Sequence, residues 1–311
     1  MDFKHISVLL NESVDMLKVD PSGTYVDGTL GGGGHASLIC SKLSSDGRLI
    51  GIDRDMDAIN AAGERLEGYS CIKEIVHDNF FNIKRILKDL DIPEIDGAIL
   101  DLGVSSYQLD TSERGFSYNM DADLDMRMDR SADLDAYNVV NEYEEDRLRR
   151  ILRDYGEEKN AAKIARNIVK AREVKPIRTT FELSEIIKKS FPPAKRYADK
   201  HPAKRSFQAI RIEVNGELDG LGEAVSDFAD VLKTGGRLSV ITFHSLEDRI
   251  VKNVFADLAR GCTCPKEFPV CVCGNKPKIR MINKKPITAG GEELKNNNRA
   301  HSAKLRVIEK L

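Results

Sequence analysis

The stretch YVDGTLGGGGH (residues 25–35) and the stretch LIGID (residues 49–53) decide the fold of this 311-residue chain. Tyr25 and Val26 are typical of the end of a buried strand, the glycines of a turn that lets a ligand lie against bare backbone, and His35 of a helix start. The second stretch delivers Asp53 about twenty residues after the turn, where doubly wound folds bind a ribose. This order predicts a site for a nucleoside-carrying cofactor.

The glycine stretch also indicates which cofactor to expect. A Walker loop needs Lys followed by Ser or Thr after its glycines, but His35 and Ala36 follow Gly34 here. The dinucleotide pattern requires a third glycine where this chain has Ser37. Asp27 would repel a pyrophosphate but suits a sulfonium or an ammonium group. The pattern therefore favours S-adenosylmethionine over NAD, and the alternative is a glycine-rich surface turn without a ligand.

The net charge of −2 conceals a strong asymmetry along the chain. Residues 147–210 hold 18 Lys and Arg against 7 Asp and Glu, a surplus of 11, and residues 275–311 hold 10 against 3, a surplus of 7. Two separate basic regions favour contact with a polyanion over simple solvation of helix faces. No apolar run reaches the length of a bilayer span, and the first residues do not read as a signal peptide. We expect a cytoplasmic protein without membrane contact.

Short apolar segments alternate with helical patterns, which predicts an α/β fold with a mostly parallel, doubly wound sheet. The expected strands are 47–53, 71–76, 95–101 and 237–243, the expected helices are 56–66, 80–90 and 214–232, and the glycines of Lys233-Thr234-Gly235-Gly236 should end the last helix. The gap after Asp101 is too long for one crossover, so we expect an inserted all-helical domain over residues 107–207 within a core formed by 1–106 and 208–311. Its expected helices are 141–155, 160–172 and 180–190. Residues 278–282 and 302–308 suit an antiparallel hairpin at a sheet edge.

Polar residues follow several expected strands at the edge where open α/β sheets bind ligands. After the strand that ends at Asp101 come Ser105 and Gln108, and Asp101 could accept a proton or a hydrogen bond from an amine. Phe80, after another strand, offers an aromatic wall for adenine, although such a residue also suits a core. His244 follows a further strand, where Ser245 capping a helix with Asp248 is the alternative explanation. We name Asp101, Ser105 and His244 as candidate catalytic residues.

The cysteines bear on both chemistry and metal binding. No cysteine ends the strands at Asp101 or Phe243, which argues against cytosine C5 methylation, whereas methylation of an amine needs no thiol. Cys262, Cys264, Cys271 and Cys273 form a cluster with one residue inside each pair, an unusual spacing for zinc. Zinc, a reversible disulfide and free thiols all remain open, so we assign no metal ligands.

The chain resembles the MraW/RsmH family of S-adenosylmethionine-dependent ribosomal RNA methyltransferases from end to end. Seven ordered motifs carry the resemblance: DGTLGGGGH (27–35), DLGVSS (101–106), RGFS (114–117), DMRMD (125–129), FQAIRIEVN (207–215), FHSLEDR (243–249) and NRAHSAKLR (298–306). Departures from the common pattern, at Lys204-Arg205-Ser206 and at His301, bear on RNA contact only.

The resemblance implies a Rossmann-like class I methyltransferase fold and N4-methylation of a cytidine in the decoding region of 16S ribosomal RNA. The expected substrate is the small (30S) ribosomal subunit, and a homodimer is left open. The implied cofactor contacts are Gly33, Gly34, His35, Asp53, Phe80, Asp101 and Gln108. Two rival functions are an NAD-dependent oxidoreductase and a noncatalytic ribosome assembly factor.

Overall fold

The computed structural model describes residues 7–196, 201–262, 264–265, 270 and 272–311. The chain forms two compact units, one of residues 1–103 and 220–311 and the other of residues 104–219. Within the described part of the chain, no helix is both long enough and apolar enough to cross a membrane.

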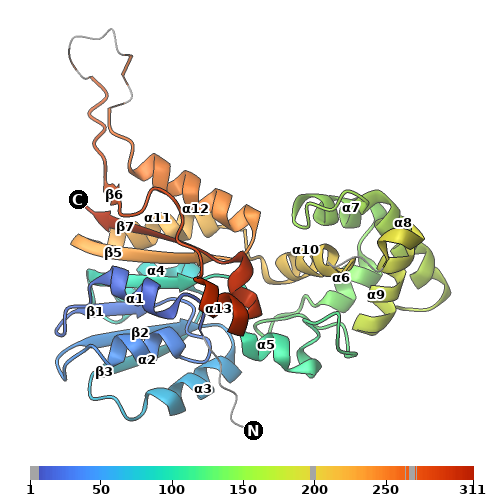
Figure 1. Cartoon of the computed structure of the whole chain (residues 1–311), viewed down its shortest axis with the longest axis horizontal. Helices are drawn as coiled ribbons and strands as arrows, with labels where there is room; N and C mark the ends of the chain where they lie inside the picture. Colours follow the sequence, from blue (N-terminus) through green and yellow to red (C-terminus); the bar gives the residue numbers. More distant parts are fainter. Residues whose placement is uncertain (1–6, 197–200, 263, 266–269, 271) are drawn as a thin grey trace. The chain divides into compact units, whose positions relative to one another are not determined.

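The first unit is built on a seven-stranded mixed sheet with the order β3-β2-β1-β4-β5-β7-β6 (Figure 1). The first five strands in this order run parallel, whereas β7 pairs antiparallel with both β5 and β6. The strands are β1 (Thr24–Asp27), β2 (Arg48–Asp53), β3 (Ile72–His77), β4 (Ile95–Asp101), β5 (Leu232–Thr242), β6 (Ile279–Met281) and β7 (Lys304–Lys310). This confirms the predicted fold class and the antiparallel pairing of the tail.

Helices cover both faces of this sheet (Figure 1). The strand order reverses at β1, and right-handed crossovers then place α2 and α3 on one face and α4 on the other. On the first face, α1 buries its apolar side with α2 and α3 against the sheet, and on the second, α11 contacts α4 and α12. The helices are α1 (Leu10–Leu17), α2 (Gly34–Cys40), α3 (Met56–Leu66), α4 (Ile83–Asp89), α11 (Leu221–Val231), α12 (Ser245–Leu258) and α13 (Gly291–Asn296).

The helix expected over residues 214–232 is two helices. The helix α10 (Lys204–Asn215) ends where Gly216 adopts a left-handed φ of 57°, and α11 begins at Leu221. Glycine tolerates this conformation because it has no Cβ, so it ends the helix. The expected glycine end of α11 is also wrong, because Lys233–Gly236 already belong to β5, at a register shift between Ile95 and Gly97 of β4.

The second unit is helical and has its own apolar core. Its helices are α5 (Ser106–Asp110), α6 (Ala136–Glu142), α7 (Glu145–Asp154), α8 (Ala161–Val174), α9 (Thr180–Lys189) and α10. The single helix expected over residues 141–155 breaks at Tyr143 and Glu144, whose backbones are extended. The expected end of the insertion at Phe207 falls inside α10, whose buried Phe207, Ile210 and Val214 belong to this core.

Candidate cofactor site

The candidate site of the first unit lies at the carboxyl ends of β1, β2 and β4. Asp27 ends β1, Asp53 ends β2 and Asp101 ends β4, so parallel pairing brings three carboxylates to one edge of the sheet. The strand order reverses between β1 and β4, which is the point where open α/β sheets bind ligands. The strand order therefore gives a second reason, besides the sequence motif, to expect a ligand site at this edge.

Asp27 is buried, with only 1% of its surface exposed. Its Oδ1 accepts a hydrogen bond from the backbone N–H of Thr29 at 3.2 Å, whereas Oδ2 is buried and has no hydrogen-bond partner among the described residues. Burial raises the pKa of Asp27 to about 6, although the nearby His35 acts in the opposite direction. A buried carboxylate oxygen without a donor is costly, and a cationic ligand would remove that cost.

Asp101 repeats this arrangement on the neighbouring strand. Its Oδ1 is buried without a hydrogen-bond partner in the described part of the chain, and its Oδ2 lies 4.0 Å from His35 Nδ1. Burial raises the pKa of Asp101, while the charges of His35 and Arg299 oppose the rise. The other ring nitrogen of His35, Nε2, lies 3.1 Å from the carbonyl oxygen of Val8, to which only an N–H can donate. His35 is thus fixed with its second nitrogen toward Asp101.

The glycine loop is held by Asp53. Its Oδ2 accepts the backbone N–H of Gly31 at 2.8 Å, and its Oδ1 accepts that of Asp55 at 2.9 Å. Each oxygen retains a lone pair, so the carboxylate can also accept ribose hydroxyls. A Cβ on Gly34 would lie 1.9 Å from Ser7 Oγ, which shows how closely α2 approaches the segment before α1. A side chain at Gly34 would therefore have to displace the Ser7 side chain.

Phe80 lies beside this edge, in a short 3₁₀ turn after β3. Its ring meets that of Phe81 edge-on, with centroids 4.7 Å apart, and that of Phe228 at 6.4 Å. A Cβ on Gly28, which follows β1, would lie 3.4 Å from Phe80 Cβ. The side chain is partly buried, so one part of it packs on aromatic neighbours and another remains accessible. This placement is compatible with the predicted adenine wall.

Ser105 and Gln108 belong to the second unit. Ser105 caps α5: its Oγ accepts the backbone N–H of Gln108, and Gln108 Oε1 accepts the backbone N–H of Ser105. Gln108 is buried, with 4% of its surface exposed. This reciprocal cap explains the Ser105 hydroxyl without catalysis, and the cofactor contact of Gln108 stays a prediction.

His244 is the cap of α12, which corrects the expected cap by Ser245 with Asp248. The His244 side chain accepts the backbone N–H of Glu247 at 3.4 Å, and Glu247 Oε2 accepts those of Phe243 and His244. His244 Nε2 also lies 3.0 Å from Glu247 Oε1, without the alignment of a hydrogen bond. Asp248 instead pairs with Lys304 and Arg306 of β7. The predicted catalytic role of His244 stays untested.

Three residues near the site lie within the quoted motifs, but the sequence analysis gave them no role. Thr29 Oγ1 accepts the backbone N–H of Asp101 at 2.6 Å and so joins the ends of β1 and β4. Glu247, 2% exposed, acts on Asp101 by charge, as does Arg299, whose guanidinium lies 5.1 Å from the centre of the Phe243 ring. The acidic residue three positions after His244 was a signal for Glu247, but a histidine cap is uncommon. Arg299 belongs to the motif at 298–306, but nothing local in the sequence relates it to Asp101.

Comparisons with known proteins show what the chain is similar to as a whole. Residues 2–311 match the model of the MraW methylase family. A relative from Clostridium botulinum (strain Kyoto / Type A2) is 59% identical over 100% of both chains, and one from Brevibacillus brevis is 55% identical over 100% of this chain and 99% of its own. Both relatives are named ribosomal RNA small subunit methyltransferase H.

Proposed function

The chain belongs to the MraW methylase family, and from this premise we propose that it transfers a methyl group from S-adenosylmethionine to the N4 amine of a cytidine in the decoding region of 16S ribosomal RNA. The names of its relatives support small-subunit ribosomal RNA as the substrate. The finer assignment, to cytidine N4 in the decoding region of the 30S subunit, rests on the sequence resemblance.

One observation carries the choice of cofactor: Asp27 Oδ2 and Asp101 Oδ1 are both buried without a hydrogen-bond partner among the described residues. They stand on adjacent strands beside a glycine loop. A pyrophosphate would meet two carboxylates there, whereas a sulfonium with an ammonium group offers the missing positive charge. These residues therefore fit S-adenosylmethionine better than a dinucleotide.

Each remaining residue of the edge has a proposed task. Asp53 accepts the ribose hydroxyls, Phe80 covers the adenine, and the backbone of Gly33 and Gly34 with His35 borders the methionine part. Gly33 adopts a left-handed φ of 73° as the residue before α2, which exposes the backbone of the turn. Gln108 completes the set only by resemblance.

The proposed chemistry needs a positioned amine and a place for its proton. S-adenosylmethionine would supply an electrophilic methyl group on sulfur. As the N4–CH3 bond forms, the S–CH3 bond breaks and N4 loses one proton. Asp101 is the proposed proton acceptor, directly or through a water. Its Oδ1 has no donor from the described residues, so it has lone pairs for a proton as well as for the cofactor's positive charge, and burial raises its pKa, which favours proton uptake. Ser105 and His244 are secondary candidates, since both already serve as helix caps.

The proposed RNA contacts are the two basic regions. Residues 147–210 lie within the second unit and carry a surplus of 11 positive charges, and residues 275–311 of the first unit carry a surplus of 7. Basic residues attract RNA phosphates whatever the nucleotide sequence. The reaction also requires that the cytidine be presented unstacked to the methyl donor. A dimer and a cytoplasmic location stay predictions.

The direct test is methyl transfer from labelled S-adenosylmethionine to small subunits that lack the modification. We expect label in the 16S ribosomal RNA, mapped by digestion and mass spectrometry to N4 of a decoding-region cytidine. Asp101→Asn should slow single-turnover transfer more than it weakens cofactor binding, while Glu67→Gln, an exposed residue just beyond α3 and outside both basic regions, should change neither. Absence of transfer with intact cofactor binding would favour the assembly-factor alternative, and label at C5 would refute the amine assignment.

A further inference from the structure

The connection between α12 and β6 departs from the sheet as a long excursion with two arms (Figure 1). Its base is held by backbone contacts, since the N–H of Lys278 donates to the carbonyl of Leu258 at 2.8 Å. One step further out, Asn275 Nδ2 donates to the carbonyls of Arg260 and Gly261 at 3.2 and 2.8 Å. The two arms therefore run side by side from the base outward.

Beyond these contacts the described part of the excursion has no apolar core. Val270 and Val272 expose 70% and 73% of their surface, and neither belongs to a core cluster. Cys262 and Cys273 are exposed and Cys264 is partly buried. Cysteine is among the residues most often found inside proteins, so two exposed cysteines and a partly buried one in one short segment require another explanation.

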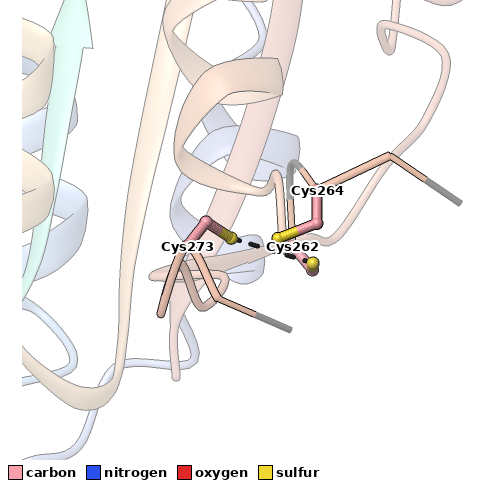
Figure 2. A group of neighbouring side chains, drawn as sticks. All are labelled: Cys262, Cys264 and Cys273. Carbon is pink, nitrogen blue, oxygen red and sulfur yellow. Dashed lines mark hydrogen bonds between the residues drawn. The ribbon is translucent and has the colours of Figure 1, made fainter. Parts of the chain in front are cut away.

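The thiols of these three cysteines converge between the two arms (Figure 2). Their sulfur atoms all lie within 4.8 Å of one another, and Cys273 Sγ lies 3.7 Å from Cys262 Sγ. The backbone N–H of Val272 points at Cys264 Sγ at 3.3 Å. An N–H directed at sulfur favours the thiolate, which is the form that binds metals.

We propose that Cys262, Cys264 and Cys273 bind a structural zinc ion as thiolates. Zinc–sulfur bonds of about 2.3 Å in a tetrahedron place two sulfurs about 3.8 Å apart. The separation of 3.7 Å between Cys262 and Cys273 matches that edge. The sulfurs of Cys262 and Cys264 come within 4.8 Å despite the single residue between them, so the short spacing is no obstacle. The fourth cysteine of the sequence cluster, Cys271, lies outside the described residues.

The cluster also differs from a simple disulfide pair. Cys262, Cys264 and Cys273 are all free thiols here, and the 3.7 Å between Cys262 and Cys273 is a contact of two thiols, longer than the S–S bond of about 2.05 Å. A disulfide would also leave Cys264 without a role, whereas a metal uses all three thiols. Zinc would join Cys262 and Cys264 on one arm to Cys273 on the other and so replace the missing core.

The experiment measures zinc in the full-length chain purified under a reductant and without chelator. We expect about one zinc per chain, and a fall to about a tenth of that in Cys262→Ser, Cys264→Ser and Cys273→Ser. Cys71→Ala is the matched control, because Cys71 is buried in the core of the first unit, and it should retain the metal. Cobalt(II) added to the metal-free chain should give the absorption bands of a tetrahedral thiolate site.

A second measurement uses only the wild-type chain, so it does not depend on how well a variant folds. In the wild-type chain, alkylation of Cys262, Cys264 and Cys273 should be slow until a chelator is added, and a reductant alone should not accelerate it. The proposal is overturned if the chain contains no zinc and binds none when zinc alone is added. It is equally overturned if the serine variants retain the metal, or if a reductant rather than a chelator releases the thiols.

Discussion

Asp27 of the first unit and Asp125 of the second are both shielded from solvent, but their pKa values are shifted in opposite directions. Asp125 receives hydrogen bonds from Arg127 Nε at 2.8 Å, Nη2 at 3.1 Å and the backbone N at 3.0 Å. Burial alone would raise the pKa of Asp125, but its bonds to Arg127 outweigh burial and lower it. Asp27 has one backbone donor, and burial raises its pKa to about 6. The paired Asp125 is thus part of the architecture, whereas Asp27, with one oxygen that no described residue contacts as a donor, is the proposed partner of a cationic ligand.

The largest expected effect is that of Asp27→Asn on cofactor binding. Removing the negative charge leaves the proposed sulfonium without its partner, so we expect affinity for S-adenosylmethionine to fall by about a hundredfold or more. Isothermal titration calorimetry measures this loss. Glu67→Gln, a similar change beyond the end of α3 and away from the strand ends, is the control. An unchanged affinity in Asp27→Asn would contradict the role given to the unpaired carboxylate.

The same variant should stabilise the cofactor-free chain. Because the folded pKa of Asp27 is raised from 3.8 to about 6, its contribution to stability is fully present below pH 3.8 and lost as the pH rises through 6. The ionised group then costs about 3 kcal/mol, of which Asn should recover about 2, since its amide still lacks a partner. Chemical denaturation of the wild type and of Asp27→Asn at about pH 7.5, where Asp27 is ionised, measures this gain in the free energy of unfolding. A loss of stability in Asp27→Asn would contradict the cost that we assign to the ionised Asp27.

Asp125→Asn should act in the opposite direction. It leaves the Arg127 guanidinium with one charged partner fewer, so we expect the free energy of unfolding to fall by about 2 kcal/mol at neutral pH. Because the pKa of Asp125 is lowered, its contribution is present above the ordinary pKa and lost as the pH falls through the folded value. Asp154→Asn, at the exposed pair with Arg153, should change stability by less than about 0.5 kcal/mol.

Cofactor affinity should follow the protonation of Asp27. Below its pKa of about 6 the cofactor-free site is increasingly neutral, so affinity should fall by up to about tenfold for each pH unit. Above that value affinity should level off. Titrations between about pH 5 and pH 8 test this dependence, and Asp27→Asn should give a much flatter profile. An equally steep profile in the variant would show that another group, such as Asp101, causes the pH dependence of cofactor affinity.

The sequence predicted most of the first unit because its signals are local. The glycine loop, the apolar strands and Asp53 follow one another within thirty residues, and β4 matches its expected bounds of 95–101. Helix ends were less predictable, because a left-handed Gly216 or an extended Tyr143 breaks a helix without interrupting the apolar pattern.

Parts of the site could not be predicted because they depend on distant pairing. Asp27 was singled out from its charge beside the glycines, but the sequence does not say that its second oxygen lacks a donor. The hydrogen bond from the Asp101 backbone to Thr29 joins residues 72 positions apart. Arg299 influences Asp101 across nearly two hundred residues, which only the folded sheet brings together.

The smallest expected effect concerns His244, and it extends the comparison to helix caps. The His244 side chain caps α12 of the first unit, and the Ser105 side chain caps α5 of the second. Helix capping thus accounts for both polar residues without a catalytic role. Asn is a good cap, and His244→Asn should therefore change the free energy of unfolding by less than about 0.5 kcal/mol, whereas His244→Ala should lose about 1 kcal/mol. If capping is its only task, His244→Asn should also keep single-turnover methyl transfer close to the wild-type rate. A large fall in that rate, with stability and cofactor affinity intact, would show that the imidazole contacts the reacting groups.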